Sequence, residues 1–232
     1  MTLFGSPPSW LRARRRTTVV LTVVLTLAAA LTGTAEVTVR DRIADRIAAA
    51  AGKRLGTTPD VGLGSTPALW QLARGTLPDV ELTADGVATR HMTGLAVDAH
   101  LHQVRRSGKG GTVGSSAVTV DADAASLAGT GGSGVVVPDP AHGRLVVHLG
   151  RSGALTVPVT PTLHGRTIRL VPGRPAFDGS PLPGALAQEV TARAARTIPL
   201  TDLPLELRPR RLTVTDTGLR LTLSGGHAAV SV

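Results

Sequence analysis

The nine residues at positions 95–103 read LAVDAHLHQ, and their apolar and polar side chains alternate. Successive side chains of a β-strand point to opposite faces of its sheet, so the alternation predicts a strand with one buried and one solvated face. The apolar face carries Leu95, Val97, Ala99 and Leu101, and the opposite face carries Asp98, His100 and His102. One-sided burial of this kind is typical of antiparallel sheets.

A second clear signal is a predicted hairpin near the C-terminus. Leu212 and Val214 alternate with threonines, Asp216–Gly218 supplies a turn, and Leu219–Leu223 alternates again. We expect further short strands, separated by turns that contain Pro or Gly, at 80–84, 118–120, 134–137, 145–149, 155–159, 167–171 and 228–232. The stretches 57–64, 105–114, 129–134 and 177–183 are expected to be turns or loops, and 121–128 a short helical turn.

Two longer segments have the four-residue spacing of an amphipathic helix. Glu36–Leu55 places an apolar residue at every fourth position from 39 to 55, and Gly184–Thr197 has a similar pattern before Pro199. A short helix is expected at Pro67–Ala73, in which Trp70 would most simply be a core residue or else lie at a lipid interface. The order helix, strands, helix and hairpin predicts an α+β fold with a largely antiparallel sheet, one face of which is covered by helices.

The N-terminus has the layout of an export signal or a signal-anchor. An uncharged run, Thr17–Leu31, follows a cluster of arginines at 12–16. We expect 1–16 to be a cytoplasmic basic tail, 17–35 a transmembrane anchor or signal peptide, and 36–232 an exported domain. As a helix, 17–35 would reach about 28 Å and would only just span the roughly 30 Å hydrocarbon core, while Gly33 and Ala35 suit a cleavage site. Two alternatives therefore remain: a single-pass protein of the cell membrane, or a protein secreted after cleavage of this segment.

The amino-acid composition limits the kinds of core, site and binding partner that we expect. Hydrophobic residues make up 42% of the 232 residues but aromatic residues only 2%, so the core must be packed with Val, Leu, Ile and Ala. The absence of Cys excludes disulfides, thiolate metal sites and Cys nucleophiles. The net charge is +9, of which four charges belong to the arginines at 12–16, and the remaining excess of five on 36–232 favours anionic lipid headgroups or polymers as partners. We expect no nucleic-acid partner, because no basic cluster is interleaved with aromatic residues.

No residue pattern in the sequence indicates a catalytic activity. His100 and His102, with Asp98 on the same strand face, would suit Zn²⁺ only if a further ligand approached, and any polar strand face has the same pattern. The sequence contains neither an H-E-x-x-H motif nor a G-x-S-x-G elbow, and its glycine pairs lie outside a strand–loop–helix context. We therefore expect a binding protein without a metal, a cofactor or an enzymatic activity.

Three groups of sequence, taken in order, resemble one known family. They are VRDRIADRI at 39–47 after the apolar N-terminus; STPALWQLARG at 65–75 followed by VELTADGV at 80–87; and LPLEL at 203–207 with LTVTDTGLRLTLSG at 212–225. Their order and spacing are similar to those of the LmeA-like phospholipid-binding proteins of the actinobacterial cell envelope. The resemblance covers most of 36–232. The chain departs from the family in its scarcity of aromatic residues and in its Gly-rich loops at 107–114 and 129–134.

The resemblance implies both a fold and a function. Family members are single α+β domains in which a strongly curved antiparallel sheet wraps a long helix, similar to tubular lipid-binding folds. They bind anionic phospholipids without catalysis and are implicated in the assembly of envelope lipoglycans, so there is no catalytic residue to carry over. The alternative that the residues leave open is an envelope scaffold that contacts protein or glycan. The oligomeric state stays undetermined.

The lipid hypothesis assigns roles to particular side chains. Acyl chains would contact apolar residues of both helices and of the predicted strand, namely Ile43, Ile47, Leu55, Trp70, Leu95, Val97, Leu101, Leu186 and Val190. Basic residues beside the terminal hairpin would meet an anionic headgroup, namely Arg208, Arg210 and Arg211. The same apolar stripes would also build the core of any domain in which helices cover a sheet.

Overall fold

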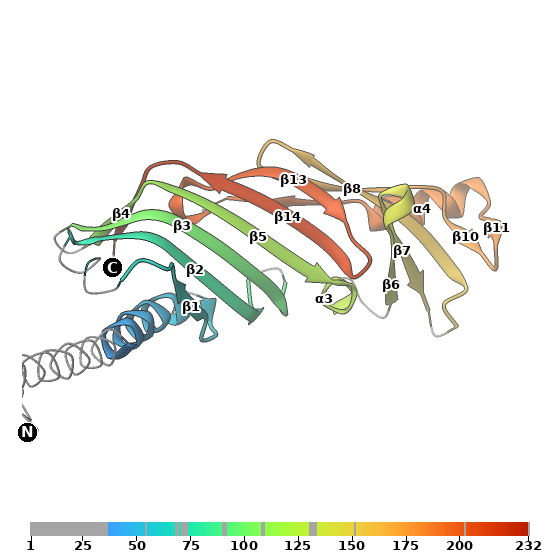
Figure 1. Cartoon of the computed structure of the whole chain (residues 1–232). Coiled ribbons are helices and arrows are strands. Elements are labelled where there is room, and N and C mark those ends of the chain that lie inside the picture. The colour runs from blue at the N-terminus through green and yellow to red at the C-terminus, as the bar shows by residue number, and fades with distance from the viewer. Residues whose placement is uncertain are drawn as a thin grey trace, which may run out of the picture.

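The computed structural model describes residues 37–53, 55–67, 70, 74–89, 92–107, 110–129, 134–150, 152–201 and 203–231. The predicted basic tail and membrane segment, positions 1–35, lie outside this part of the chain. Within it, no helix has both the length and the apolar character that crossing a bilayer requires. Figure 1 shows an elongated body in which two sheets follow one another, with the N-terminal helix at one end and α4 (Gly184–Ala194) toward the other.

The larger sheet contains eight strands, all paired antiparallel. Its order is β1-β2-β3-β5-β14-β13, and β4 pairs with both β3 and β15. The strands are β1 (Asp60–Leu63), β2 (Thr76–Val87), β3 (Leu95–Ser107), β4 (Gly110–Val113), β5 (Ser115–Asp123), β13 (Arg208–Val214), β14 (Gly218–Gly225) and β15 (Ala228–Ser231). The strand predicted at 95–103 is confirmed within β3. The loop predicted at 105–114 is wrong, because β3 continues to Ser107 and β4 follows.

The smaller sheet contains seven strands, also antiparallel. Its order is β11-β10-β8-β7-β6, and β9 pairs with both β8 and β12. The strands are β6 (Gly134–Asp139), β7 (Arg144–Leu149), β8 (Leu155–His164), β9 (Thr167–Pro172), β10 (Ala176–Phe177), β11 (Ser180–Pro181) and β12 (Arg196–Pro199). The stretch 177–183 is therefore not wholly a loop, since β10 and β11 form a very short hairpin there.

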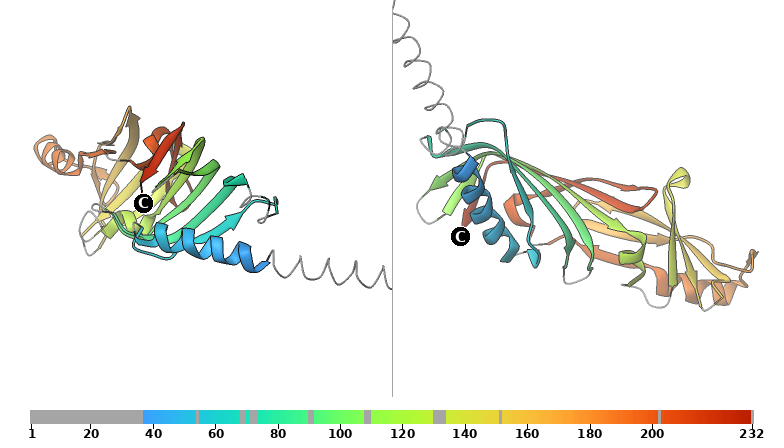
Figure 2. Two further views of the ribbon diagram at one scale, coloured as in Figure 1. Left: turned by 90° about the vertical axis from the view of Figure 1, so that its left-hand side faces the viewer. Right: turned by 60° about the horizontal axis from the view of Figure 1, so that its bottom comes forward.

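Helices are few among the described residues. The N-terminal helix covers 37–53 with one half-buried face, and the Arg40 guanidinium donates a hydrogen bond to the Gly64 carbonyl, next to β1. The helix lies at the β1 end of the larger sheet, as Figure 1 and Figure 2 show. The largely antiparallel architecture is confirmed, but the structure does not show a sheet wrapped around a long helix. The helix predicted at 184–197 is present as α4 but ends at Ala194, because Ala195 is extended and the chain continues into β12.

The predicted C-terminal hairpin is confirmed as β13 and β14. Thr215 and Gly218 exchange backbone hydrogen bonds of 2.8 and 3.3 Å across its turn. Gly218 lies so close to β5 that an added Cβ would collide with the Ala122 carbonyl oxygen. The glycine therefore serves the pairing of β14 with β5 as well as the turn.

A short helix, α3 (Ala124–Gly129), directly follows β5. The Asp123 carboxylate accepts a hydrogen bond of 3.0 Å from the Ser126 N–H, which satisfies a donor at the start of the helix. Hydrogen bonds from Ser126 also lower the pKa of Asp123. The strand predicted at 118–120 is thus longer than expected, and the helical turn predicted at 121–128 begins only at Ala124.

Buried apolar side chains form three clusters. The first joins Ala84, Val87, Leu95 and Ala122; the second joins Ala99, Val118, Leu207 and Leu223; the third joins Val136, Leu145 and Leu219. Leu219 belongs to the larger sheet and the other two members of the third cluster to the smaller one. Leu127 of α3 packs against both the first and the third cluster. The small helix therefore fills the junction at which the two sheets meet.

Candidate functional site

The larger sheet presents one continuous apolar face. Antiparallel register places Val97, Val120 and Leu221 side by side on three adjacent strands, and Leu212 continues the line on β13. We call these four residues the central row. All four are half-buried, whereas the lines of side chains on either side of them contain the buried residues of the first and second clusters. The central row is therefore apolar surface that the protein covers only in part.

Protein segments cover the two ends of this apolar face. Partly buried side chains from outside the sheet pack on the first cluster at one end, namely Leu55, Met92 and Leu127. At the other end Leu207, which is 4% exposed, joins the second cluster, and Leu203 and Leu205 pack beside it. These last residues flank or belong to η2 (Pro204–Glu206). The central row thus lies between two covered ends.

The structure brings several of the predicted lipid contacts together. Val97 belongs to the central row, and Leu101 lies half-buried on the same side of β3. Leu95, also on that side, is 6% exposed and belongs to the first cluster, against which Leu55 packs. Ile43 and Ile47 occupy the half-buried face of the N-terminal helix.

Trp70 is not a core residue. Its side chain is 55% exposed, so the simplest interpretation of this residue from the sequence is wrong. The Arg74 guanidinium lies 4.4 Å from the centre of the indole ring, a cation–π arrangement. Burial could not be predicted here because an apolar residue on a short helix says nothing of what lies opposite it.

The predicted contacts Leu186 and Val190 lie elsewhere. Both belong to α4, which contacts β8 and β9 of the smaller sheet. Leu186 is 53% exposed and Val190 half-buried. Figure 1 places α4 far from the N-terminal helix. The nine predicted apolar contacts therefore do not line a single place.

The three predicted headgroup residues are exposed on β13. A β-bulge between Pro209 and Arg211 leaves Arg210 as an extra residue in the strand, and Arg210 Nε donates a hydrogen bond of 2.6 Å to Ser224 Oγ. Arg208 pairs with Ser224 and Arg211 with Thr222, on the face opposite to the central row. The arginines thus form one basic edge on the polar face of the sheet.

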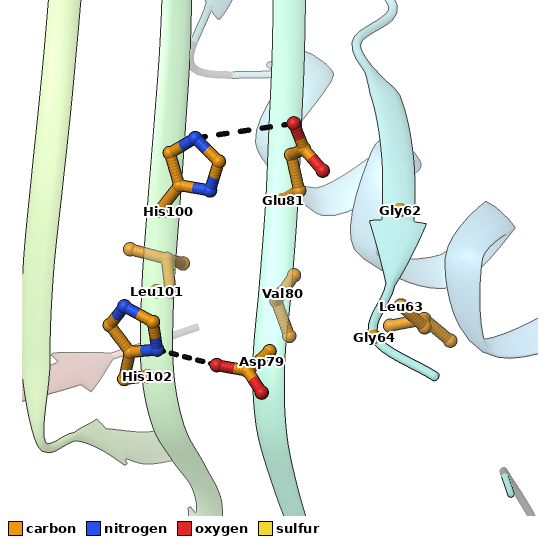
Figure 3. A pocket seen from close by; sticks show the side chains of 9 residues that line it. All are labelled: Gly62, Leu63, Gly64, Asp79, Val80, Glu81, His100, Leu101 and His102. Atoms are coloured by element: carbon orange, nitrogen blue, oxygen red, sulfur yellow. Dashed lines mark hydrogen bonds and ion pairs between the residues drawn. The ribbon is translucent and has the colours of Figure 1, made fainter. Parts of the chain in front are cut away.

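The polar face also carries a group of histidines and carboxylates at its β1 end (Figure 3). His102 Nδ1 lies 2.5 Å from Asp79 Oδ1. His100 Nε2 lies 2.9 Å from Asp98 Oδ1 and 4.0 Å from Glu81 Oε1. All five side chains are polar and accessible, and four of them line a cavity of about 240 Å³.

Sequence reasoning found only the half of this group that lies on β3. Asp98, His100 and His102 were visible as one strand face, and the structure confirms that they share it. Asp79 and Glu81 on β2 were missed as their partners, because only the register sets Glu81 opposite His100 and Asp79 opposite His102. The available signal was the matching alternation of the segment 79–84.

Comparison with known proteins gives one family. Residues 30–224 match the LmeA family, described as LmeA-like phospholipid-binding. The match covers most of the chain and includes both the N-terminal helix and the C-terminal hairpin. Neither the curated proteins nor the solved structures gave a match. The chain therefore belongs to the LmeA-like phospholipid-binding family.

Proposed function

We propose that this protein binds phospholipid without catalysis, with acyl chains lying against the central row of the larger sheet. The observation that carries the proposal is an apolar line of four side chains, Val97, Val120, Leu221 and Leu212, left half-buried between two covered ends. Membership of a phospholipid-binding family supports a lipid as the ligand.

The energetics of chain burial favour this use of the apolar face. Removing a CH₂ group from water contributes about 0.8 kcal/mol, so a sixteen-carbon chain could contribute on the order of 12 kcal/mol before ordering costs. Aliphatic side chains suit such a chain because they offer dispersion contacts and no polar group that needs a partner.

We further propose that Arg208, Arg210 and Arg211 attract anionic headgroups. They are exposed on the face opposite to the central row, so they would meet a membrane surface rather than the buried chain. The net charge of +9 less the four arginines at 12–16 leaves an excess of five on 36–232, which has the sign that this attraction requires. We place the domain outside the cytoplasmic membrane, held by segment 17–35 or released after its cleavage, in support of envelope lipid or lipoglycan assembly.

The chain-binding part is tested by extracting lipid from full-length protein purified in a mild detergent. Val97→Thr combined with Val120→Thr keeps side-chain shape and strand propensity but makes the central row more polar. We expect the double variant to retain several-fold less phospholipid by native mass spectrometry. Val135→Thr with Val137→Thr, on the exposed face of the smaller sheet, is the matched control and should retain the parental amount. Equal lipid retention in parent and central-row variant would count against the proposal.

The headgroup part is tested by changing Arg208, Arg210 and Arg211 together to Gln. Exposed charges are screened beyond roughly 8 Å at physiological ionic strength, so the parent's affinity for a fluorescent anionic phospholipid should fall as salt rises. The triple variant should bind less tightly at low salt and show a flatter salt dependence, with an unchanged circular dichroism spectrum. Identical salt curves would mean that these arginines are only a solvated surface.

The second candidate function is an envelope scaffold that contacts protein or glycan. Three valines favour it because they are exposed on one face of the smaller sheet: Val135, Val137 and Val171. The same pair of double variants separates the two functions. A scaffold would lose crosslinked partners in the Val135 and Val137 variant while its lipid content stayed unchanged.

A further inference from the structure

The polar face of β2 and β3 holds three side chains that can each offer one atom to a metal ion. Glu81 and His100 are direct cross-strand neighbours, and Asp98 lies two residues before His100 on the same face. One ligand atom from each of the three lies within 4.8 Å of the others. Figure 3 shows the His100 ring directed across the strand pair toward Glu81. The grouping comes from two strands and so is fixed by sheet register rather than by one flexible loop.

The separations fit a small divalent cation. Bonds of about 2.0–2.1 Å from a tetrahedral ion place neighbouring ligand atoms about 3.3 Å apart. His100 Nε2 lies 2.9 Å from Asp98 Oδ1 and 4.0 Å from Glu81 Oε1, values that bracket this spacing. The three side chains are about half exposed, so small rotations would bring them to equal distances. One imidazole and two carboxylates leave a fourth position for water.

Glycines on the edge strand keep the space beside the carboxylates open. Gly62 pairs with Glu81, and a Cβ added to it would lie 3.4 Å from Glu81 Cβ and 3.6 Å from Oε2. Gly64 lies in the same way beside Asp79. Both glycines line the cavity of about 240 Å³ that Glu81 and His100 also line. An ion with a bound water would therefore have room on this side.

The surrounding charges favour a cation as well. Asp79, two residues before Glu81 on the same face of β2, contributes a third carboxylate. Its Oδ1 lies 2.5 Å from Nδ1 of His102. On the other side of β3, register pairs His100 with Ala117 and Asp98 with Thr119, so β5 brings no basic side chain opposite these residues. Asp139 on the smaller sheet differs from these carboxylates, because it contacts Arg144 as well as His142. The guanidinium of Arg144 therefore already neutralises its charge.

We propose that Glu81, Asp98 and His100 bind one divalent transition-metal ion on the polar face of the larger sheet. The ion would crosslink β2 to β3 with an open coordination position toward solvent. The proposal is independent of phospholipid binding, because the metal ligands and the central row lie on opposite faces of the larger sheet and share only the strand β3.

The test uses full-length protein without a histidine tag, held in a neutral detergent and first freed of metal with a chelator. Titration with Zn²⁺ by calorimetry should show one ion per chain, and Co²⁺ should give the absorption of a low-symmetry site. Zn²⁺ at about a hundredfold excess over its Kd should raise the Tm by roughly 5–10 °C. Glu81→Gln and His100→Gln should each weaken binding at least about tenfold.

His142→Gln is the matched control, since it removes an exposed histidine that also contacts an aspartate. It should bind Zn²⁺ as the parent does. The proposal is overturned if the parent binds no Zn²⁺, if binding survives both ligand substitutions, or if the control loses affinity equally. Circular dichroism of all four proteins establishes that any loss belongs to the site rather than to the fold.

Discussion

The two sheets distribute apolar residues in different ways. In β3 of the larger sheet, strict alternation puts Leu95 on the buried side and His100 on the solvent side. In β6 of the smaller sheet three valines follow one another: Val136 is 9% exposed, while Val135 and Val137 are 64% and 45% exposed. A one-residue slip in β3 would bury histidines, whereas a slip in β6 would exchange valine for valine. Register is therefore strongly specified by burial in β3 and weakly in β6.

The first prediction concerns Leu223, the largest by volume of the fully buried side chains among the described residues. Leu223 is 2% exposed, so Leu223→Ala should lower the free energy of unfolding by roughly 3 kcal/mol through lost burial and an unfilled cavity. Leu170→Ala makes the same substitution at a half-buried position of β9 in the smaller sheet and should cost about 1 kcal/mol. Urea unfolding followed by circular dichroism measures both. Equal costs would mean that the face of the smaller sheet on which Leu170 lies is as well covered as the position of Leu223.

The second prediction compares neighbours within β6. Val136→Ala removes two buried methyl groups from the third cluster and should cost about 2 kcal/mol. Val135→Ala, one residue earlier on the exposed face, should change stability by no more than about 0.5 kcal/mol. The same unfolding experiment decides. A large cost at Val135 would show that its face is covered in the folded protein and that the comparison between the sheets is wrong.

The smallest effect concerns a charge cluster of the smaller sheet. Hydrogen bonds from His142, and then from Arg144, hold the pKa of Asp139 below its usual value. A lowered folded-state pKa contributes stability that is present above the ordinary carboxyl pKa, about 4, and is lost as pH falls through the lowered value. Asp139→Asn should therefore flatten the acid limb of the stability curve, measured by thermal unfolding across acidic pH. If the parent and Asp139→Asn lose stability equally as the pH falls, the contacts of Asp139 with His142 and Arg144 do not contribute to stability.

The sequence predicted best where one face of a strand is buried. β3 and β14 were recognisable because their periodicity follows from burial on one side. β4 was not, because it is rich in glycine and pairs with β15 from the far end of the chain, a contact that no local window contains. Trp70 was predicted wrongly for a related reason. A large apolar side chain does not by itself show that another part of the protein covers it, and Trp70 is 55% exposed.

The candidate site was predictable only in part, and for the same reason. Val97 was named from the alternation of one strand, but its neighbours Val120 and Leu221 required the strand order β3-β5-β14. Leu186 and Val190 were grouped with them because all are apolar, and the structure places them at the other sheet. Side-chain chemistry can be read residue by residue, whereas proximity across a sheet depends on pairings between distant segments.

The bulge at Arg210 has a consequence for how this strand tolerates changes of length. Counting back by twos from Leu212 would put Arg210 on the apolar face, and the extra residue is what keeps it in solvent. Deleting Arg210 would join Pro209 to Arg211 and restore a regular strand in which every other side chain keeps its face. Deleting Thr213 instead would invert one side of the strand relative to the other. The chain can thus gain or lose a residue at position 210 while the alternation of apolar and polar side chains on β13 is kept. The charge of this edge can therefore vary without a change of fold.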